Sequence, residues 1–219
     1  MAVLSTVCAC PTACGTTPRG GRRYAARTLA AMQAELKRAE RRANAAAEAD
    51  GVKFGCLNDL DVGADGTIYF TEASHKFPMA QHVNDLLEHQ PNGRLLALDP
   101  QSQKPRPLLS DLYFANGVAV SPDGTFVLVA ETGKYRIRRV WLKDSKNDIF
   151  IDNLPGFPDG ISSNGKDKFW LALVTPRQAL VDRMLPYPFI RKMVVRMPKF
   201  LQPGPQRYSF VLGLDPQGH

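Results

Sequence analysis

The sequence predicts an all-β chain built from a repeated strand–turn–strand unit. The clearest copy runs from Asn58 to Thr71 as N-D-L-D-V-G-A-D-G-T-I-Y-F-T, where an Asp-Gly turn joins an alternating strand to a β-branched, aromatic one. The phrase returns from Asn116 as N-G-V-A-V-S-P-D-G-T-F-V-L-V, and more loosely from Asp159 as D-G-I-S-S-N-G-K-D-K-F-W-L-A. The copies start 58 and 43 residues apart, which suits propeller blades or another repeat array.

The three copies also share one register. The polar residue that opens each copy stands ten positions before an apolar residue, which is Ile68, Phe126 or Phe169. Equivalent strands of a propeller point toward one central axis, so equal offsets give equivalent positions. We therefore expect Asn58, Asn116 and Asp159 to converge at one end of that axis.

Composition agrees with an all-β chain and narrows the partners. The 219 residues include 17 Gly and 17 Pro between many short apolar runs. The net charge of +7 is uneven, because residues 1–50 hold eight Arg and Lys against four acids and residues 176–204 hold six against one. Such patches permit contact with anionic surfaces. No basic stripe is interleaved with base-stacking aromatics, so we expect no nucleic-acid partner.

Residues 1–50 differ from the rest, and we expect a separate, partly helical or disordered segment there, followed by a partial propeller over residues 51–219. From Thr28 to Asp50, Leu, Met and Ala recur at helical spacing, which predicts a helix. Its apolar stripe is thin and half alanine, so we expect the helix to be exposed or frayed.

Further elements are expected around the three copies. A short helix is expected over residues 80–89, with Val83, Leu86 and Leu87 inward. Strands are expected over residues 93–100, 107–112, 135–142 and 148–151. Tyr208 to Leu214 is expected to start one more strand pair.

Residues 175–205 form an insertion with helical pieces broken by prolines. Arg and Lys alternate there with large apolar residues, among them Phe200, so the segment is amphipathic and basic. Such a segment suits a cap over the channel or contact with a membrane surface, with Arg191 and Lys192 facing the lipid.

Four cysteines, at positions 8, 10, 14 and 56, do not favour a metal cluster. The spacing C-x-C-x3-C lacks the paired knuckles of a zinc site, and no His lies nearby. No run of 18 apolar residues is present, so we expect no transmembrane helix. The first residues lack the basic region that opens a signal peptide, and the compartment stays open.

Four segments together carry a family resemblance. They read N-D-L-D-V-G-A-D-G-T-I-Y-F-T-E-A-S-H-K-F, G-R-L-L-A-L-D-P, F-A-N-G-V-A-V-S-P-D-G-T-F-V-L-V-A-E-T-G-K-Y-R-I-R-R and N-L-P-G-F-P-D-G-I-S. Residues 52–216 thereby resemble the strictosidine synthase-like, or adipocyte plasma membrane-associated protein-like, family of six-bladed propellers in the gluconolactonase–paraoxonase group. The resemblance implies a ring about twice the content seen here, so we expect about three blades with the closing blade missing. An incomplete ring would expose an apolar flank at each end, which favours self-association.

Asn58, Asn116 and Asp159 would supply amide and carboxylate oxygens, the ligands that Ca²⁺ prefers. The resemblance implies the same set, because the calcium-dependent members place Asn, Asn and Asp ligands at the matching positions. It also implies that Asp159 acts as nucleophile or base while the metal polarises a carbonyl or phosphoryl oxygen. Those members add a Glu from the first blade, for which no equivalent is recognisable here. Asp59 would lie just behind the ligands.

The favoured function is thus a calcium-dependent hydrolase of small esters or lactones, of the arylesterase type. One alternative is the amine–aldehyde condensation of strictosidine synthase, which relies on a glutamate of the closing blade, expected beyond His219. The other is a non-catalytic binding or scaffold protein. Glu72 and His75 are weaker candidates that we expect at a polar loop edge, and Glu131 is expected in a charge network on the outer part of a blade. No G-x-S-x-G, P-loop or dinucleotide fingerprint is present.

Overall fold

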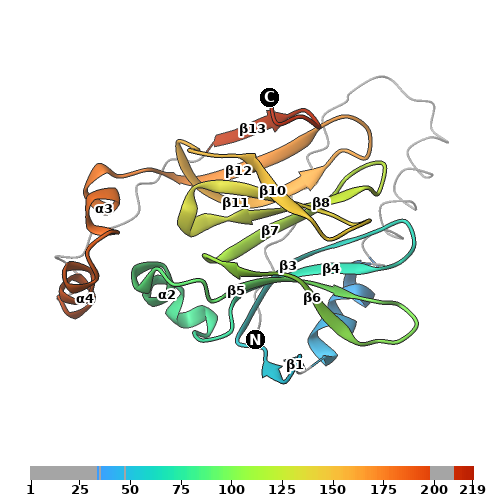
Figure 1. Ribbon diagram of the computed structural model, residues 1–219, viewed down its shortest axis with the longest axis horizontal. Coiled ribbons are helices and arrows are strands. Elements are labelled where there is room, and N and C mark those ends of the chain that lie inside the picture. The colour runs from blue at the N-terminus through green and yellow to red at the C-terminus, as the bar shows by residue number, and fades with distance from the viewer. Residues whose placement is uncertain (1–33, 35, 47, 198–209) are drawn as a thin grey trace, which may run out of the picture.

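The computed structural model describes residues 34, 36–46, 48–197 and 210–219. Three antiparallel sheets, here called blades 1, 2 and 3, follow one another along the chain and stack face to face (Figure 1). Blade 1 contains, in spatial order, β3 (Cys56–Val62), β4 (Ile68–Ser74), β5 (Gly93–Leu98) and β6 (Pro105–Leu112). Blade 2 contains β7 (Ala115–Val120), β8 (Phe126–Glu131), β9 (Arg136–Trp141) and β10 (Asn147–Ile151). Blade 3 contains β11 (Gly156–Ser163), β12 (Phe169–Pro176) and β13 (Phe210–Leu214). The predicted all-β propeller fold, present in part, is confirmed.

Short helical elements connect or flank the blades. Residues 36–45 are helical and precede a small hairpin of β1 (Glu48–Ala49) and β2 (Val52–Lys53). The 3-10 turn η1 (Met79–Gln81) and helix α2 (His82–Glu88) lie between β4 and β5. The 3-10 turn η2 (Thr132–Lys134) follows β8, and helices α3 (Ala179–Met184) and α4 (Pro188–Arg196) follow β12. Within the described residues, no helix is both long and apolar enough to cross a bilayer.

The repeated turn forms as its sequence requires. In blade 1, Gly66 adopts a φ of +83°, a left-handed conformation that glycine takes without strain, and the Asp65 carboxylate accepts the Thr67 N–H at 2.9 Å. Blade 2 repeats this arrangement with Gly124 at a φ of +67° and Asp123. Turn chemistry of this kind fixes the register of the first two strands in each blade.

The core lies between the blades rather than within them. The three apolar residues in equivalent register, Ile68, Phe126 and Phe169, are all buried. The Phe126 and Phe169 rings pack between blades 2 and 3 with centroids 6.0 Å apart. Tyr69, Leu95 and Val118 belong to a second cluster between blades 1 and 2. Because each blade buries a face on its neighbour, the inner strands of successive blades are held side by side.

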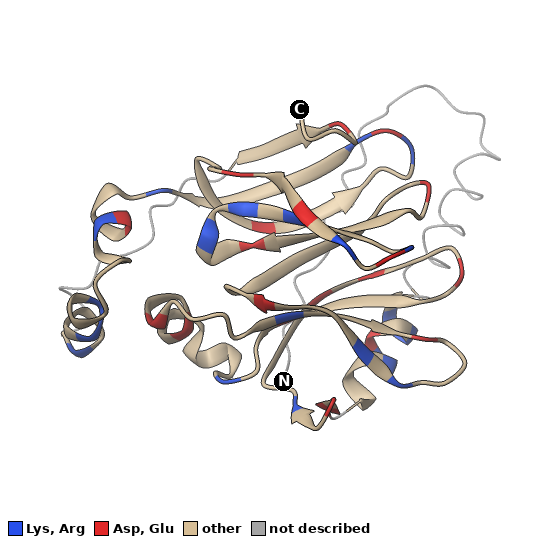
Figure 2. Cartoon of the chain, viewed as in Figure 1, with Lys and Arg blue, Asp and Glu red and all other residues tan. Residues whose placement is uncertain are grey.

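Two charged residues expected at the surface are fully buried. Glu72 lies inside β4, where it accepts the Gly55 N–H at 2.8 Å and pairs with Arg94, whose Nε lies 2.6 Å from a carboxylate oxygen. Glu131 lies at the equivalent place in β8, accepts the Tyr113 N–H at 3.0 Å and pairs with the first residue of β9, in a strand rich in arginine (Figure 2). The loop-edge expectation for Glu72 is therefore wrong. The charge network expected around Glu131 is present, but Glu131 is buried in β8 and does not lie on the outer part of the blade. Each glutamate joins the chain entering its blade to the third strand of that blade.

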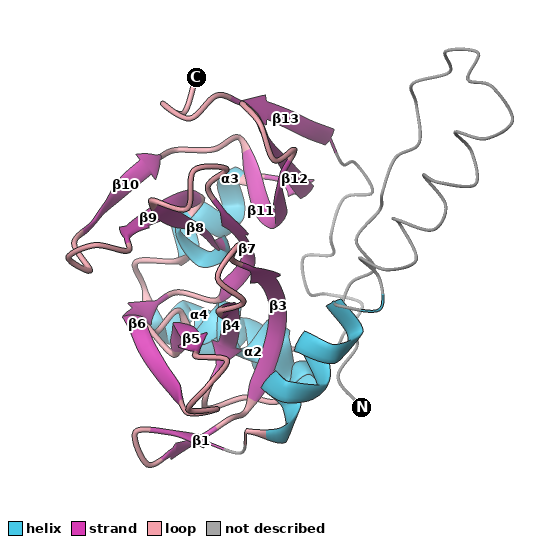
Figure 3. Ribbon diagram, turned by 90° about the vertical axis from the view of Figure 1, so that its right-hand side faces the viewer, coloured by secondary structure: helices cyan, strands magenta, loops and turns pink. Residues whose placement is uncertain are grey.

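The N-terminal helix covers the free flank of blade 1. Ala39 and Ala43 are buried against Ile68, Phe70 and other residues of β4 and β5, beside β3 in Figure 3. The expectation of an exposed helix is wrong for this inner face, because alanine lets a helix backbone approach a sheet closely. The prediction of an apolar flank at each end fails here too. At the opposite flank, on blade 3, Trp170 is 47% exposed and Val211 62% exposed.

The last strand belongs to blade 3, which the sequence did not predict. β13 pairs with β12 from Phe169↔Leu214 to Leu173↔Phe210, so it is the third strand of blade 3 and does not open another repeat. In α2, Val83 is 46% exposed, whereas Asp85 is the buried residue and accepts a hydrogen bond from Asn92 at 2.9 Å. Cys56 is a buried free thiol, and the other three cysteines and Phe200 lie outside the described residues.

Candidate functional site

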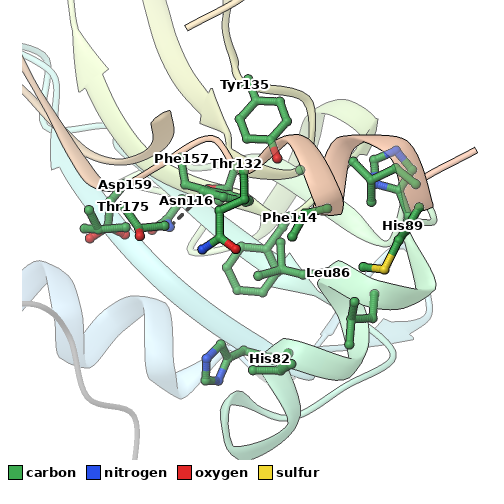
Figure 4. A pocket seen from close by; sticks show the side chains of 18 of the residues that line it. His82, Leu86, His89, Phe114, Asn116, Thr132, Tyr135, Phe157, Asp159 and Thr175 are labelled. Atoms are coloured by element: carbon green, nitrogen blue, oxygen red, sulfur yellow. Dashed lines mark hydrogen bonds between the residues drawn. The ribbon is translucent and has the colours of Figure 1, made fainter. Parts of the chain in front are cut away.

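The innermost strand of each blade contributes one polar side chain to a common site (Figure 4). Asn58 comes from β3, Asn116 from β7 and Asp159 from β11. The Asn58 Nδ2 donates to Asn116 Oδ1 at 2.7 Å, and Asn116 hydrogen-bonds in turn to the Asp159 carboxylate. The structure thus brings together the three residues that the equal offsets selected. Both asparagines are 8% exposed, and Asp159 is half-buried.

Two threonines that the sequence analysis missed fix Asn116 in place. Its Nδ2 donates to the Thr132 hydroxyl at 3.2 Å, and that hydroxyl donates to the Pro158 carbonyl at 2.6 Å. The Thr71 hydroxyl donates to the backbone carbonyl of Asn116, also at 2.6 Å. Hydrogen bonds therefore run across all three blades around this one side chain. Neither threonine stands in a recognisable motif.

A glycine allows the inner strands to meet closely enough for this. A Cβ on Gly117 would lie 2.4 Å from the Asp159 carbonyl oxygen and 2.5 Å from the Ile161 nitrogen. Backbone atoms cannot yield to such contacts. Gly117 therefore sets the distance between β7 and β11 at the point where Asn116 meets Asp159.

Asp59 and Asp61, which follow Asn58 along β3, also bridge to β7. Their carboxylates accept the N–H groups of Val118 at 3.2 Å and Val120 at 2.8 Å. Burial raises the pKa of Asp59 to about 6, against the lowering effect of these hydrogen bonds, and the neighbouring Asp61 and Asp159 add to the rise. Burial also raises the pKa of Asp159, while its bond from Asn116 acts in the opposite direction. A buried carboxylate with a raised pKa is a stronger base than an exposed one.

A cavity of about 490 Å³ opens above the three polar residues. Its walls are mainly apolar and come from α2, α3, α4, the loop after β6 and the start of β11, with residues such as Leu86, Phe114, Phe157, Met184 and Val194. Such a site combines a small polar end with a large apolar volume, the usual form of a small-molecule pocket.

Two further polar residues line the cavity away from its floor. The Tyr135 hydroxyl is buried beside the Asp182 carboxylate, and burial together with this carboxylate raises its pKa. The ring centroids of His89 and Tyr113 lie 4.8 Å apart. Burial, together with the nearby charges of Lys134 and Arg191, lowers the pKa of His89 to about 4, so this histidine is neutral at pH 7. His75, by contrast, is exposed at the surface.

One arginine joins the two parts of the roof. Arg191 of α4 is 6% exposed and donates from Nη1 to the Leu87 carbonyl of α2 at 2.9 Å and to the Glu88 carbonyl. These are carbonyls of the last turn of α2, which have no partners within the helix. Arg191 therefore caps α2 and does not face outward, contrary to the sequence-based expectation of a lipid contact.

The residues at the floor fit calcium in donor type. Asn58, Asn116 and Asp159 offer two amide oxygens and a carboxylate, and Ca²⁺ takes six to eight oxygens, so water or substrate would complete the shell. Across the described part of the chain, no three His, Cys, Asp or Glu side chains gather to hold a metal, so a soft or borderline metal finds no alternative cluster there.

Comparisons with known proteins point to one family. Residues 58–145 match the family domain described as strictosidine synthase. Strictosidine synthase-like 7 of Arabidopsis thaliana is 40% identical over 153 residues, which cover 70% of this chain and 41% of that protein. Adipocyte plasma membrane-associated protein of Mus musculus is 37% identical over 179 residues, covering 77% of this chain and 43% of that protein. The chain thus spans less than half the length of these two relatives.

Solved structures with a similar fold include two proteins of the gluconolactonase group. A gluconolactonase from Xanthomonas campestris matches with a TM-score of 0.46 and 24% identity, over 59% of this chain and 45% of that one. Regucalcin from Agrobacterium tumefaciens, described as a calcium-binding protein, matches with a TM-score of 0.43 and 23% identity, over 53% and 38%.

Proposed function

The chain is a member of the strictosidine synthase-like family, homologous to the plant strictosidine synthase-like and adipocyte plasma membrane-associated proteins. From this premise we propose that its site hydrolyses small esters or lactones with the help of Ca²⁺. The convergence of Asn58, Asn116 and Asp159 at the floor of one apolar cavity carries the proposal.

The chain's own residues supply binding and proton transfer. The apolar walls hold the acyl or ring part of the substrate and exclude bulk water from the reacting carbonyl. Asp159 is the base: its carboxylate accepts a proton from the attacking water as the oxygen adds to the carbonyl carbon. The protonated Asp159 then returns that proton to the departing alkoxide, which restores the carboxylate. Calcium, when bound, would supply polarisation of the carbonyl oxygen.

Thr132 and Thr71 position the site without touching the substrate. Their bonds hold Asn116 in one orientation, with its amide between Asn58 and Asp159. Because Asn116 in turn bonds to the Asp159 carboxylate, the base is also held in place and loses little orientational freedom when the substrate binds.

The test uses the full 219-residue chain with aryl esters and lactones, in Ca²⁺ or in a chelator. Thermal unfolding with and without Ca²⁺ gives a second readout, since a ligand at 100 times its Kd stabilises a protein by ~2.7 kcal/mol. Asp159→Asn keeps the shape of the side chain and should lower the hydrolysis rate by roughly 10²- to 10⁴-fold. It should also remove most of the calcium-dependent stabilisation. Asp167→Asn, in the exposed β11–β12 turn, is the matched control and should change neither.

Other outcomes would favour other functions. Hydrolysis that persists in Asp159→Asn would place the chemistry elsewhere. Ligand binding with no calcium effect and no hydrolysis would favour a binding protein. Condensation of an amine with an aldehyde that is insensitive to calcium would favour the strictosidine synthase reaction.

A further inference from the structure

Helix α4 has two faces that differ in what they touch. Arg191 and Val194 are buried, and they hold α4 against α2 and the cavity. The opposite face carries Phe189, Lys192, Met193 and Arg196, spaced i, i+3, i+4 and i+7 along one stripe of the helix. A solvent face normally holds polar residues, yet Phe189 is 74% exposed and Met193 54% exposed.

Two more large side chains near this stripe are exposed. Tyr187, just before α4, is 59% exposed, and Leu180 of α3 is 63% exposed. Figure 1 shows α3 and α4 projecting past the ends of the strands, so no blade covers this side of them. Basic residues of α3 and α4 are coloured blue on the ribbon in Figure 2. We define the docking face as Leu180, Tyr187, Phe189, Lys192, Met193 and Arg196.

We propose that the docking face binds the surface of an anionic lipid bilayer. Apolar side chains flanked by Lys and Arg are what an interfacial helix needs: the apolar groups enter the acyl boundary while the long basic side chains reach the headgroups. Negative lipid headgroups also complement the charge of Lys192 and Arg196. This inference does not depend on the proposed hydrolysis.

Charge argues against a second copy of the chain on the same face. A two-fold contact presents the same surface from both partners, so both copies would bring Lys192 and Arg196 into one interface. Like charges so placed oppose association, whereas an anionic bilayer neutralises them.

Docking in this way would bring the cavity roof to the membrane. Val194 lines the cavity from one side of α4, and Met193 lies on the docking face one residue away. An apolar molecule dissolved in the bilayer would then have a short path to the cavity. Arg191 is not part of the contact, because it is buried and bonded to α2.

Sedimentation of the full chain with vesicles tests the proposal. Vesicles of phosphatidylcholine alone are compared with vesicles that also contain phosphatidylserine. The chain should pellet with the anionic vesicles, and added salt should weaken the binding. Lys192→Gln with Arg196→Gln should weaken it roughly 25-fold, at about fivefold for each charge near the surface. Phe189→Ser with Met193→Ser should abolish the binding to anionic vesicles.

The control variant is Lys143→Gln with Lys166→Gln, which removes the same charge from exposed turns at the other ends of the strands. It should bind as the wild type does. All substituted residues are exposed, so the urea midpoint of each variant should match that of the wild type. Equal loss in control and docking-face variants, or no binding to anionic vesicles, would overturn the proposal. Dimers seen by light scattering and lost in Phe189→Ser with Met193→Ser, without lipid binding, would assign the face to self-association instead.

Discussion

Asp59 offers a quantitative test of how the inner strands are packed. Its carboxylate lies between β3 and β7, where Oδ1 accepts the Leu60 N–H at 2.9 Å and Oδ2 accepts the Val118 N–H at 3.2 Å. Burial outweighs these bonds and raises the pKa of Asp59 from 3.8 to about 6. The folded state therefore holds a proton that the unfolded chain has already released.

The sign of the effect follows from proton linkage. Between about pH 4 and pH 6 the folded state binds more protons at Asp59 than the unfolded state does, so stability falls as the pH rises through this window. A pKa of about 6 in place of 3.8 means that the free energy of unfolding falls by ~3 kcal/mol over the whole titration of Asp59. The share of this fall that occurs between about pH 5 and about pH 7.5 is ~1.4 kcal/mol.

Asp59→Asn isolates this contribution. The amide has one oxygen for two N–H donors, so the variant carries a pH-independent cost of ~1–3 kcal/mol. Urea unfolding in chelator, at about pH 5 and about pH 7.5, should show the gap between wild type and variant shrinking by ~1.4 kcal/mol at the higher pH. Asp123→Asn is the control: hydrogen bonds in an exposed turn lower the pKa of Asp123, so its carboxylate is charged in both states across this pH range and the gap should stay constant. A gap that stays constant for Asp59→Asn as well would show that Asp59 is not buried against β7.

Two further predictions concern buried polar groups. Arg94→Met leaves the Glu72 carboxylate buried and unpaired, and it should lower the free energy of unfolding by ~3–5 kcal/mol, whereas Lys146→Met at an exposed pair should change it by less than ~1 kcal/mol. Equal small losses in urea unfolding would contradict the buried pair. Tyr135→Phe removes a buried hydroxyl that faces the Asp182 carboxylate, so the free energy of unfolding should fall by ~1–3 kcal/mol. Unchanged stability in urea unfolding would mean that Asp182 is not a partner of the Tyr135 hydroxyl.

Sequence periodicity was sufficient for the inner strands and the floor of the site. The offset from Asn58 to Ile68 recurs in the other two copies, and both ends of the interval lie within one strand–turn–strand unit. Turn residues such as Gly66 fix the register locally, so convergence of the inner strands follows from short-range rules. The chemical roles of the three floor residues remain proposals.

Contacts between residues far apart in the sequence could not be predicted from periodicity or turn residues. Glu72 was expected at a loop edge because charged residues are seldom buried alone, but Arg94, 22 residues later, satisfies it. Ala39 and Ala43 look too small to make a core, yet small side chains are what allow a helix to approach β4. Thr132 begins the 3-10 turn η2 after β8 and Tyr135, in a left-handed conformation, ends it, and no sequence motif marks either residue.

The floor and the roof of the cavity differ in how they are held, and this difference bears on specificity. The floor lies on inner strands that are fixed by packing between blades, by Gly117 and by hydrogen bonds across all three blades. The roof comes from two insertions about a hundred residues apart, joined by the bonds of Arg191 to the end of α2. A change in α2 or α4 can therefore reshape the apolar walls without moving Asn116 or Asp159. Chemistry set by the blades and substrate choice set by the insertions would then vary independently.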